Sequence, residues 1–562
     1  MSNNTTENQF YFYGQDVWRL TNSLTISYGL AYGWQSAPVD TLGRQTILDN
    51  DVTGQPLTAP TYMSARMTAA LQGQIYNPTT DYVPVNTAGA PVFNTDWGNL
   101  APRISFAWNP SFGSDNVFGR FLGDKKTVIR GGYSLVYDRE NTIQNVVIPM
   151  LGAGFGQTLT EITPGCGSVC NDPGATDFRI GVDGNPAVPV VGPEANPIIP
   201  STPFGNFISF QDDPDMKVGR STNLDLDVQR ELPGNMLLEV GYVGNMASRL
   251  PTSADIDNAP YFFQDTQSGQ SFAQAFDNVA NSVRGGITPN AQPWFENQLP
   301  LYGKNTCGST TISNTACLIS QVGSDFANGD VQSLFQQMDL YRFGQGLTPY
   351  DNLQNQVSVL RTYLGTSNYN AFIVSLQKKT SSGLTFQVNY TLSKSLDESL
   401  VNQDNAGYFL NAFNPDASYG PSLYDRRNMF TADYVYQLPF GTGHRLHLSN
   451  GLDRAVSGWY WSGIFEAYSG LPNTVTEAAD AWGVSSILGA GVPAIATVPT
   501  SNLKNDLNSG VTGSGGIGTA TAQANGGTGL NVFANPAAAF ADFRYINLAT
   551  DGRDGSANPI RG

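Results

Sequence analysis

Strict alternation of apolar and polar residues is the feature that most restricts what this chain can fold into. In segment 384–393, Leu, Phe, Val or Tyr occupies every second position, and Thr, Gln, Asn or Ser occupies the positions between. Successive side chains of a β-strand point to opposite faces, so this pattern predicts a strand with one apolar and one polar face. About ten residues is also the length that a tilted strand needs to cross the hydrocarbon core of a membrane.

The pattern recurs along the chain and predicts about ten strands, which start near Gln9, Ser23, Ala101, Lys126, Val218, Asn235, Tyr369, Gly383, Arg427 and Ser457. Their connections alternate in length. Short turns such as RLTNS, ELPGN and KTSSG lie at one end, and long connections over about 35–100, 139–216, 250–368 and 395–426 lie at the other. Short periplasmic turns opposite long extracellular loops are typical of outer-membrane barrels. We therefore predict an all-β fold, an antiparallel transmembrane β-barrel segment that forms a partial barrel.

The two faces of these strands predict two different solvents. Large apolar residues such as Phe372, Phe386 and Val388 would face lipid, and aromatic residues gather near the strand ends, where interfacial girdles belong. The polar face would line a watery lumen, and the residues that we expect there are Asp225, Asp227, Glu239, Gln387, Asn389 and Asp433. The alternative that the alternation leaves open is a soluble β-sandwich or propeller.

Composition and charge exclude several classes of protein. The chain has 562 residues but no run of 18 or more apolar ones, which excludes a transmembrane helix. A net charge of -17 argues against binding to nucleic acid, because phosphate-binding surfaces need an excess of Lys and Arg. The first residues, MSNNTTENQFYFYGQD, do not have the pattern of a signal peptide.

The four cysteines form two local pairs, Cys166 with Cys170 and Cys307 with Cys317. Each pair lies in a Gly-, Ser-, Asn- or Thr-rich stretch, which predicts two loop disulfides in an oxidising compartment, with four separate thiols as the alternative. Zinc is not expected, because the spacings do not match a zinc site and both histidines are distant.

No other motif predicts a catalytic, cofactor or metal site. Residues 513–518 spell G-x-G-x-x-G, but in a low-complexity stretch that predicts an external loop. His444 and His447 are expected in a turn, and the carboxylates at Asp49, Asp51, Asp212, Asp213 and Asp215 are expected to be solvated loop acids. The chain has no G-x-S-x-G elbow, so we predict that it is not an enzyme. Segment 271–283 has apolar residues at helical spacing and predicts a short amphipathic helix in the longest loop.

Several segments together resemble a known family. They read FYFYGQDVWRLTNSLTISYGLAYGW, LAPRISFAWNPSFG, KTVIRGGYSLVYDR, LEVGYVGNMASRL, SNYNAFIVSLQKKTSSGLTFQVNYTLSKSLDES, YDRRNMFTADYVYQLPFG and GWYWSGIFEAYSGLP. Their order resembles the barrel of TonB-dependent receptors of the Oar-like type. The resemblance implies a plugged barrel in the bacterial outer membrane that imports a solute with energy passed on by TonB. Since neither a plug nor a carboxypeptidase-regulatory-like domain is recognisable before the first strand, we expect that the chain is an internal piece of such a receptor.

The predicted organisation is a barrel with long extracellular loops over 1–470, followed over 471–562 by a low-complexity external loop and a truncated end of the barrel. The predicted function is substrate binding and TonB-dependent import in the intact receptor. Its partners would be outer-membrane lipid, an unknown solute such as a peptide, glycan or metal chelate, and the TonB system through amino-terminal parts that this chain lacks. The alternative is a non-transporting surface or adhesion protein that displays large loops.

Overall fold

The structure of the chain is a computed structural model. It describes residues 5–43, 45–111, 119, 122–139, 196–381, 383–398, 408–440, 446, 457–472, 474–476, 481–485, 491–499 and 536–551.

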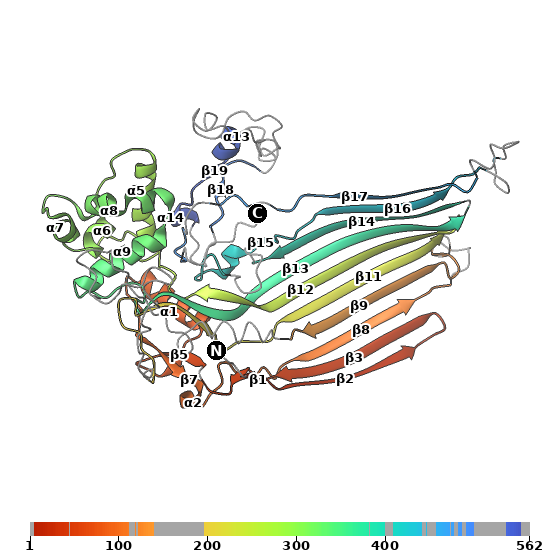
Figure 1. Cartoon of the computed structure of the whole chain (residues 1–562), viewed down its shortest axis with the longest axis horizontal. Helices are drawn as coiled ribbons and strands as arrows, with labels where there is room; N and C mark the ends of the chain where they lie inside the picture. Colours follow the sequence, from red (N-terminus) through yellow and green to blue (C-terminus); the bar gives the residue numbers. More distant parts are fainter. Residues whose placement is uncertain are drawn as a thin grey trace, which may run out of the picture.

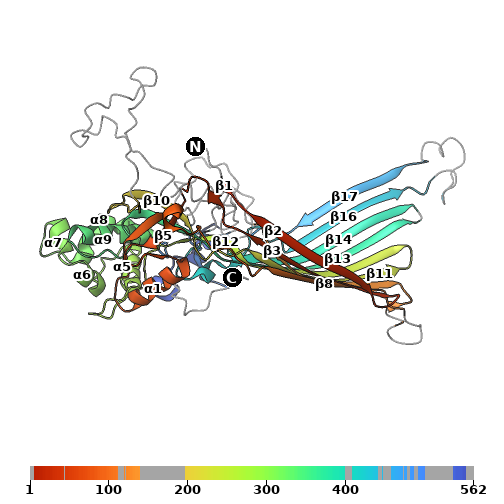
Figure 2. The same ribbon diagram turned by 90° about the horizontal axis from the view of Figure 1, so that it is seen from below.

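One large antiparallel sheet dominates the fold, with the strand order β17-β16-β14-β13-β12-β11-β9-β8-β3-β2. The bounds of these strands are β2 Gln9–Arg19, β3 Leu24–Gln35, β8 Leu100–Trp108, β9 Thr127–Tyr137, β11 Arg220–Leu232, β12 Met236–Asp255, β13 Asn355–Ser381, β14 Leu384–Asp397, β16 Asn428–Gln437 and β17 Tyr460–Tyr468. All ten predicted strands are present, and nine of them begin within three residues of the predicted start. The sheet is curved and open, with β2 and β17 at its two edges (Figure 2). The prediction of an antiparallel, partial barrel is confirmed.

The connections are sorted by length largely as the sequence predicted. The short turns between β2 and β3, β11 and β12, and β13 and β14 lie at one end of the sheet, together with the longer connections between β8 and β9 and between β16 and β17. The longest connections, between β3 and β8, β9 and β11, β12 and β13, and β14 and β16, lie at the other end (Figure 1). Part of that end is a three-stranded sheet of β5 Thr46–Asn50, β6 Gln55–Pro56 and β7 Thr80–Pro84. It also holds α1 Ala59–Leu71, α2 Val85–Ala88, β10 Asn206–Asp212, η3 Pro415–Ser418 and β15 Gly420–Pro421. Two small pairings, β1 Thr5–Thr6 with β4 Val39–Asp40 and β18 Ile495–Ala496 with β19 Phe543–Arg544, complete the strands.

The longest connection folds into helices α5 Phe272–Arg284, α6 Pro293–Gln298, α7 Tyr302–Cys307, α8 Asn314–Asn328 and α9 Val331–Gly344. Helix α5 confirms the predicted amphipathic helix, and Ser271 begins it with a reciprocal capping box to Gln274. The other four helices were not predicted; for α6 and α7 the reason is that six residues are too few to show a helical period. Helices α13 Pro536–Ala541 and α14 Leu548–Asp551 come from the last part of the chain.

The long connections pack around one large hydrophobic core and a smaller second cluster, and we call this body the cap (residues 36–43, 45–99, 196–219, 256–354, 408–427, 481–485 and 536–551). At its centre the Phe272 ring lies 4.5 Å from that of Phe335 and 5.1 Å from that of Trp294, between ring centroids. Trp482 packs into the same core, and the backbone amides of Leu548 and Ala549 donate to the Asp277 carboxylate. Segments far apart in the chain therefore form one packed body.

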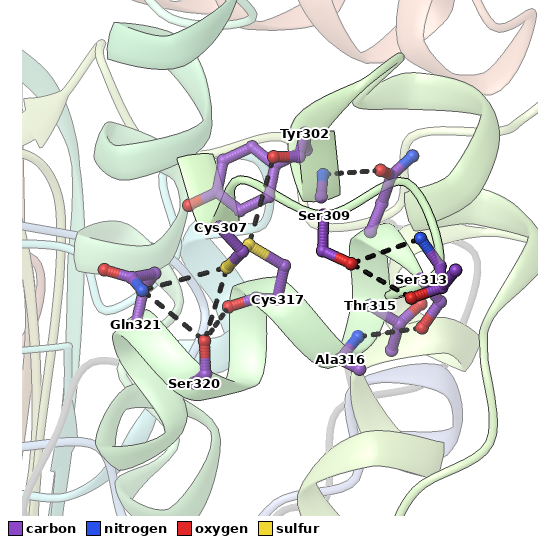
Figure 3. Close-up of a disulfide and its surroundings, with 12 residues drawn as sticks. Tyr302, Cys307, Ser309, Ser313, Thr315, Ala316, Cys317, Ser320 and Gln321 are labelled. Atoms are coloured by element: carbon purple, nitrogen blue, oxygen red, sulfur yellow. Dashed lines mark hydrogen bonds between the residues drawn. A yellow bond between two sulfur atoms is a disulfide. The ribbon is translucent and has the colours of Figure 1, made fainter. Parts of the chain in front are cut away.

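A disulfide joins two helices of the cap. Cys307 at the end of α7 is bonded to Cys317 in α8, with their Cα atoms 6.0 Å apart (Figure 3). The Ser320 and Gln321 side chains lie beside it (Figure 3). The other predicted pair, Cys166 and Cys170, lies outside the described residues.

Strands β12 and β13 continue beyond their neighbours into the cap, and β10 pairs in parallel with the first part of β13. The sequence predicted that β13 starts near Tyr369, but it starts at Asn355. The reason is that segment 355–361 is buried on both faces, and strands of that kind lose the alternation that reveals them. Among the described helices, none is both long and apolar enough to span a membrane.

Candidate functional site

The strand register places all six predicted lumen residues on one face of the sheet. Residues directly opposite one another in an antiparallel pair lie on the same face. Glu239 is opposite Ser375, which is opposite Asn389, and Gln387 is opposite Asp433. Asp225 and Asp227 join the same face through the pairing of β11 with β12. We call it the polar face, and that it lines a lumen stays a prediction.

Hydrogen bonds connect polar side chains of this face in two groups, one across β11 and β12 and one across β13, β14 and β16. Gln229 Nε2 donates to Glu239 Oε2 at 3.3 Å between β11 and β12. Farther along, Ser375 Oγ donates to Asn389 Oδ1 at 2.8 Å, and Asn389 Nδ2 donates to Thr431 Oγ1 at 3.2 Å. These side chains are half-buried, so they also remain open to hydrogen bonding with water or a passing solute.

The opposite face is apolar, and aromatic residues mark both of its ends. Phe10 stacks on Trp34, with ring centroids 5.0 Å apart, where β2 and β3 meet the cap. Near the short turns, Trp18 and Trp461 are more than half exposed. Phe10 and Trp18 lie on one face of β2, about 26 Å apart along the strand at about 3.3 Å per residue. This separation fits the apolar band of an outer-membrane barrel, which is about 25 Å tall.

The carboxylates that the sequence placed in solvent are mostly buried, so that prediction was wrong. Asp212 is 3% and Asp213 0% exposed, because β10 carries them into the cap alongside β13. Asp213 Oδ2 accepts a hydrogen bond from the backbone amide of Ala59 at 2.9 Å, at the first residue of α1. Asp49 in β5 is also buried, whereas Asp51 and Asp215 are exposed.

A second group of buried charges surrounds Arg66 of α1. Its guanidinium forms an ion pair with Asp351 and donates to the carbonyl oxygens of Ile256 and Asn258 at 2.5 and 3.0 Å. Asp255 accepts the backbone amide of Ser485 at 2.9 Å. These contacts tie α1 to the connection between β12 and β13, and they tie the end of β12 to segment 481–485.

Burial gives the cap a pH-dependent stability. It raises the pKa of Asp255 to about 7 and that of Asp351 to about 6, although Arg66 opposes both shifts. Both values lie above the usual value of about 3.9 for an unfolded chain, so the folded cap binds more protons than the unfolded chain between about pH 4 and 7.

We therefore expect the free energy of unfolding of the cap to be largest near pH 4 and to fall as the pH rises to 7. Thermal unfolding of the detergent-solubilised chain at pH 5 and pH 8 measures this difference. Asp255→Asn should reduce it, because the amide does not ionise. A melting temperature that rises with pH over this range would contradict the assignment.

The structure describes only some of the other singled-out residues. His444, His447 and the glycine-rich segment 513–518 lie outside the described residues. Within the ranges that are described, no group of three or more His, Cys, Asp or Glu side chains could hold a metal ion.

A small cavity that the sequence did not predict lies where the polar face meets the cap. It has a volume of about 170 Å³, and Gln9, Tyr11, Gln35 and Asn99 are among the residues that line it. Alternation could have placed Gln9 and Tyr11 on the polar face, but only the fold brings them to Asn99, which follows a long connection.

A family model described as an outer membrane β-barrel domain matches residues 1–561. No curated protein matches the sequence. Among solved structures, the chain is similar to the alcaligin outer-membrane receptor of Bordetella pertussis, with 8% identity over 79% of this chain and 36% of that one, at a TM-score of 0.26. It is also similar to the pyoverdine outer-membrane receptor of Pseudomonas aeruginosa, with 6% identity, 78% and 29% coverage and a TM-score of 0.28. A third similar structure is an iron transporter of Neisseria meningitidis, with 9% identity over 78% of this chain and 41% of that one, at a TM-score of 0.26. The chain thus spans less than half the length of each of these structures.

Proposed function

The chain belongs to the outer membrane β-barrel domain family, and from this membership we propose that it is part of a TonB-dependent receptor of the Oar-like type. The family places the protein in the bacterial outer membrane. In the intact receptor the barrel would bind a solute at its extracellular side and import it with energy supplied through TonB. Outer-membrane lipid would surround the apolar face, and segment 471–562 would contribute an external loop.

The observation that carries this proposal is the hydrogen-bonded row of polar side chains on one face of the sheet. A barrel that only displayed loops could fill its interior with closely packed side chains. A path for a polar solute instead needs donors and acceptors that can exchange partners. Asp225, Asp227, Glu239, Gln387, Asn389 and Asp433 would line that path.

The cap favours a second candidate function, which is display at the cell surface. Its core contains large, fully buried rings such as Trp294, Phe335 and Tyr350, so it is more substantial than a set of mobile loops. A rigid scaffold of this kind could present an adhesive surface without any transport.

Gene deletion in the native bacterium separates the two functions. If the protein is an importer, removal of its gene should abolish uptake of a set of solutes from the medium, and removal of TonB should abolish uptake of the same set. Complementation with the intact gene should restore that uptake. A deletion strain that loses surface attachment but takes up every solute normally would replace import by display.

A further inference from the structure

We propose that the cavity at the junction of the polar face and the cap binds one sugar ring of a glycan. This inference rests on the proposed receptor function and names its substrate class. The cavity lies at the ends of β2, β3 and β9, beside Asn99 and next to the long connections. A solute entering from outside would reach it before it reached the rest of the polar face.

The strand register places one side of the cavity on the polar face of the large sheet. Gln9 is opposite Gln35 and Tyr11 is opposite Gly33, and these positions share the face of Asp225 and Asp227 through the pairings of β3, β8, β9 and β11. The part of the cavity lined by Gln9, Tyr11, Gly33 and Gln35 is therefore on the polar face, whereas Trp34 and Tyr137, which also line it, come from the opposite face.

An aromatic platform forms one side of the cavity. The Tyr11 ring lies over Gly33, since a Cβ atom on Gly33 would be only 2.6 Å from Cε2 of Tyr11. Tyr11 as a residue is nevertheless 63% exposed, so it still offers surface to a ligand. Sugar rings present apolar C–H faces, and an exposed aromatic ring fixed against the backbone is the surface on which such a face can pack.

Hydrogen-bonding groups of both kinds surround the platform. Asn99 is 3% exposed and donates through Nδ2 to the carbonyl oxygen of Asp96 at 3.0 Å, while its Oδ1 has no hydrogen-bond partner among the residues described. Gln9, Gln35, Asp138 and Arg139 also line the cavity, and Gln9 Nε2 donates to Gln35 Oε1 at 3.4 Å. A sugar hydroxyl can donate to the Asn99 oxygen and also accept from an amide or guanidinium.

Size and charge exclude the other solute classes from this site. The cavity is smaller than the pockets of about 300–1,000 Å³ that hold drug-sized ligands, so it has room for one ring-sized unit and not for a metal chelate of siderophore size. Its lining residues include one acid, Asp138, and one base, Arg139, so their charges balance and favour a neutral ligand. A peptide would need an extended groove with pockets for alternate side chains.

Titration of the purified, detergent-solubilised chain with neutral oligosaccharides tests this inference. The probes are maltohexaose, cellohexaose, xylohexaose and chitohexaose, with tetra-alanine as the peptide probe, and binding is followed by tryptophan fluorescence and calorimetry. At least one oligosaccharide should bind saturably. Tyr11→Ala and Asn99→Leu should each weaken it by about tenfold, the effect of losing one stacked ring or one buried hydrogen bond.

Two variants guard against a merely structural effect. Tyr13→Ala removes an exposed ring from the same face of β2, two residues away and outside the cavity, and should leave affinity unchanged. Tyr11→Phe keeps the platform and should bind almost as tightly as the unaltered chain. Heat-modifiable gel mobility would establish that each variant folds.

Three outcomes would overturn the inference: no saturable sugar binding by the folded chain, preferential binding of tetra-alanine, or equal losses in Tyr11→Ala and Tyr13→Ala. Failure of the receptor function is distinguishable from these. If sugars bind but gene deletion leaves all uptake intact, import fails and the sugar site stands. If the deletion abolishes uptake only of solutes other than glycans, the sugar site fails and import stands.

Discussion

Val374→Arg should prevent the folded chain from accumulating in the outer membrane, whereas Ser375→Arg beside it should not. Val374 lies in the middle of the membrane part of β13 and aligns with Val240 and Tyr390 on the apolar face. An arginine that faces lipid at the bilayer midplane costs about 2–4 kcal/mol, and at a polar lumen it costs far less. A loss of this size is a large fraction of the stability of most folded domains.

Ser375→Arg is the matched control because it changes the next residue of the same strand to the same side chain. It removes the hydrogen bond to Asn389 but leaves the charge on the polar face. Membrane fractionation, protease sensitivity and heat-modifiable mobility report assembly for both variants. If Ser375→Arg abolished assembly and Val374→Arg did not, the two faces of the sheet would be inverted.

At pH 8, where the Asp351 carboxyl is ionised, Asp351→Ala should destabilise the cap by about 3–5 kcal/mol, the usual cost of leaving one partner of a buried ion pair without the other. The side chains of Arg66 and Asp351 are 2% and 7% exposed, so water cannot replace the lost carboxylate. The hydrogen bonds from Arg66 to Ile256 and Asn258 would remain, but neither carbonyl oxygen carries a compensating charge.

Arg249→Gln is the control for this prediction. It breaks an ion pair with Asp96 whose arginine side chain is 33% exposed, and pairs of this kind contribute about 0–1 kcal/mol. Chemical unfolding of the two variants, followed through the fluorescence of buried residues such as Trp294, compares their free energies of unfolding. Equal losses would mean that the buried pair does not hold the cap together.

The strands of the large sheet could be predicted because an apolar face on one side and a polar face on the other impose a period of two. This constraint is local, so segment 384–393 shows it without knowledge of its neighbours. The first part of β13 lacks the constraint because both of its faces are buried in the cap. For the same reason Asp212 reads as a loop acid in the sequence, although β10 carries it into the interior of the cap.

The cap and the cavity could not be predicted because contacts between distant segments create them. Arg66 and Asp351 are 285 residues apart, and Gln9 and Asn99 meet only after a long connection has folded back. Helix α5 is the exception, since its apolar period and its capping box lie within one segment. The polar face could be predicted in part. The alternation in the sequence predicts which residues belong to it, but only the strand register shows which of them lie opposite one another.

The shared ladder of β12 and β13 also has a mechanical consequence. It runs from Met236 opposite Lys378, near the short turns, to Asp255 opposite Val359, inside the cap. The 20 residues of β12 cover about 66 Å along the strand, so the hydrogen-bonded pair of β12 and β13 connects the cap to the end of the sheet with the short turns. A force on the cap would be transmitted directly to the large sheet, and the cap and the sheet would tilt together. The register shifts between Ser248 and Thr252 are the point at which the paired strands could bend.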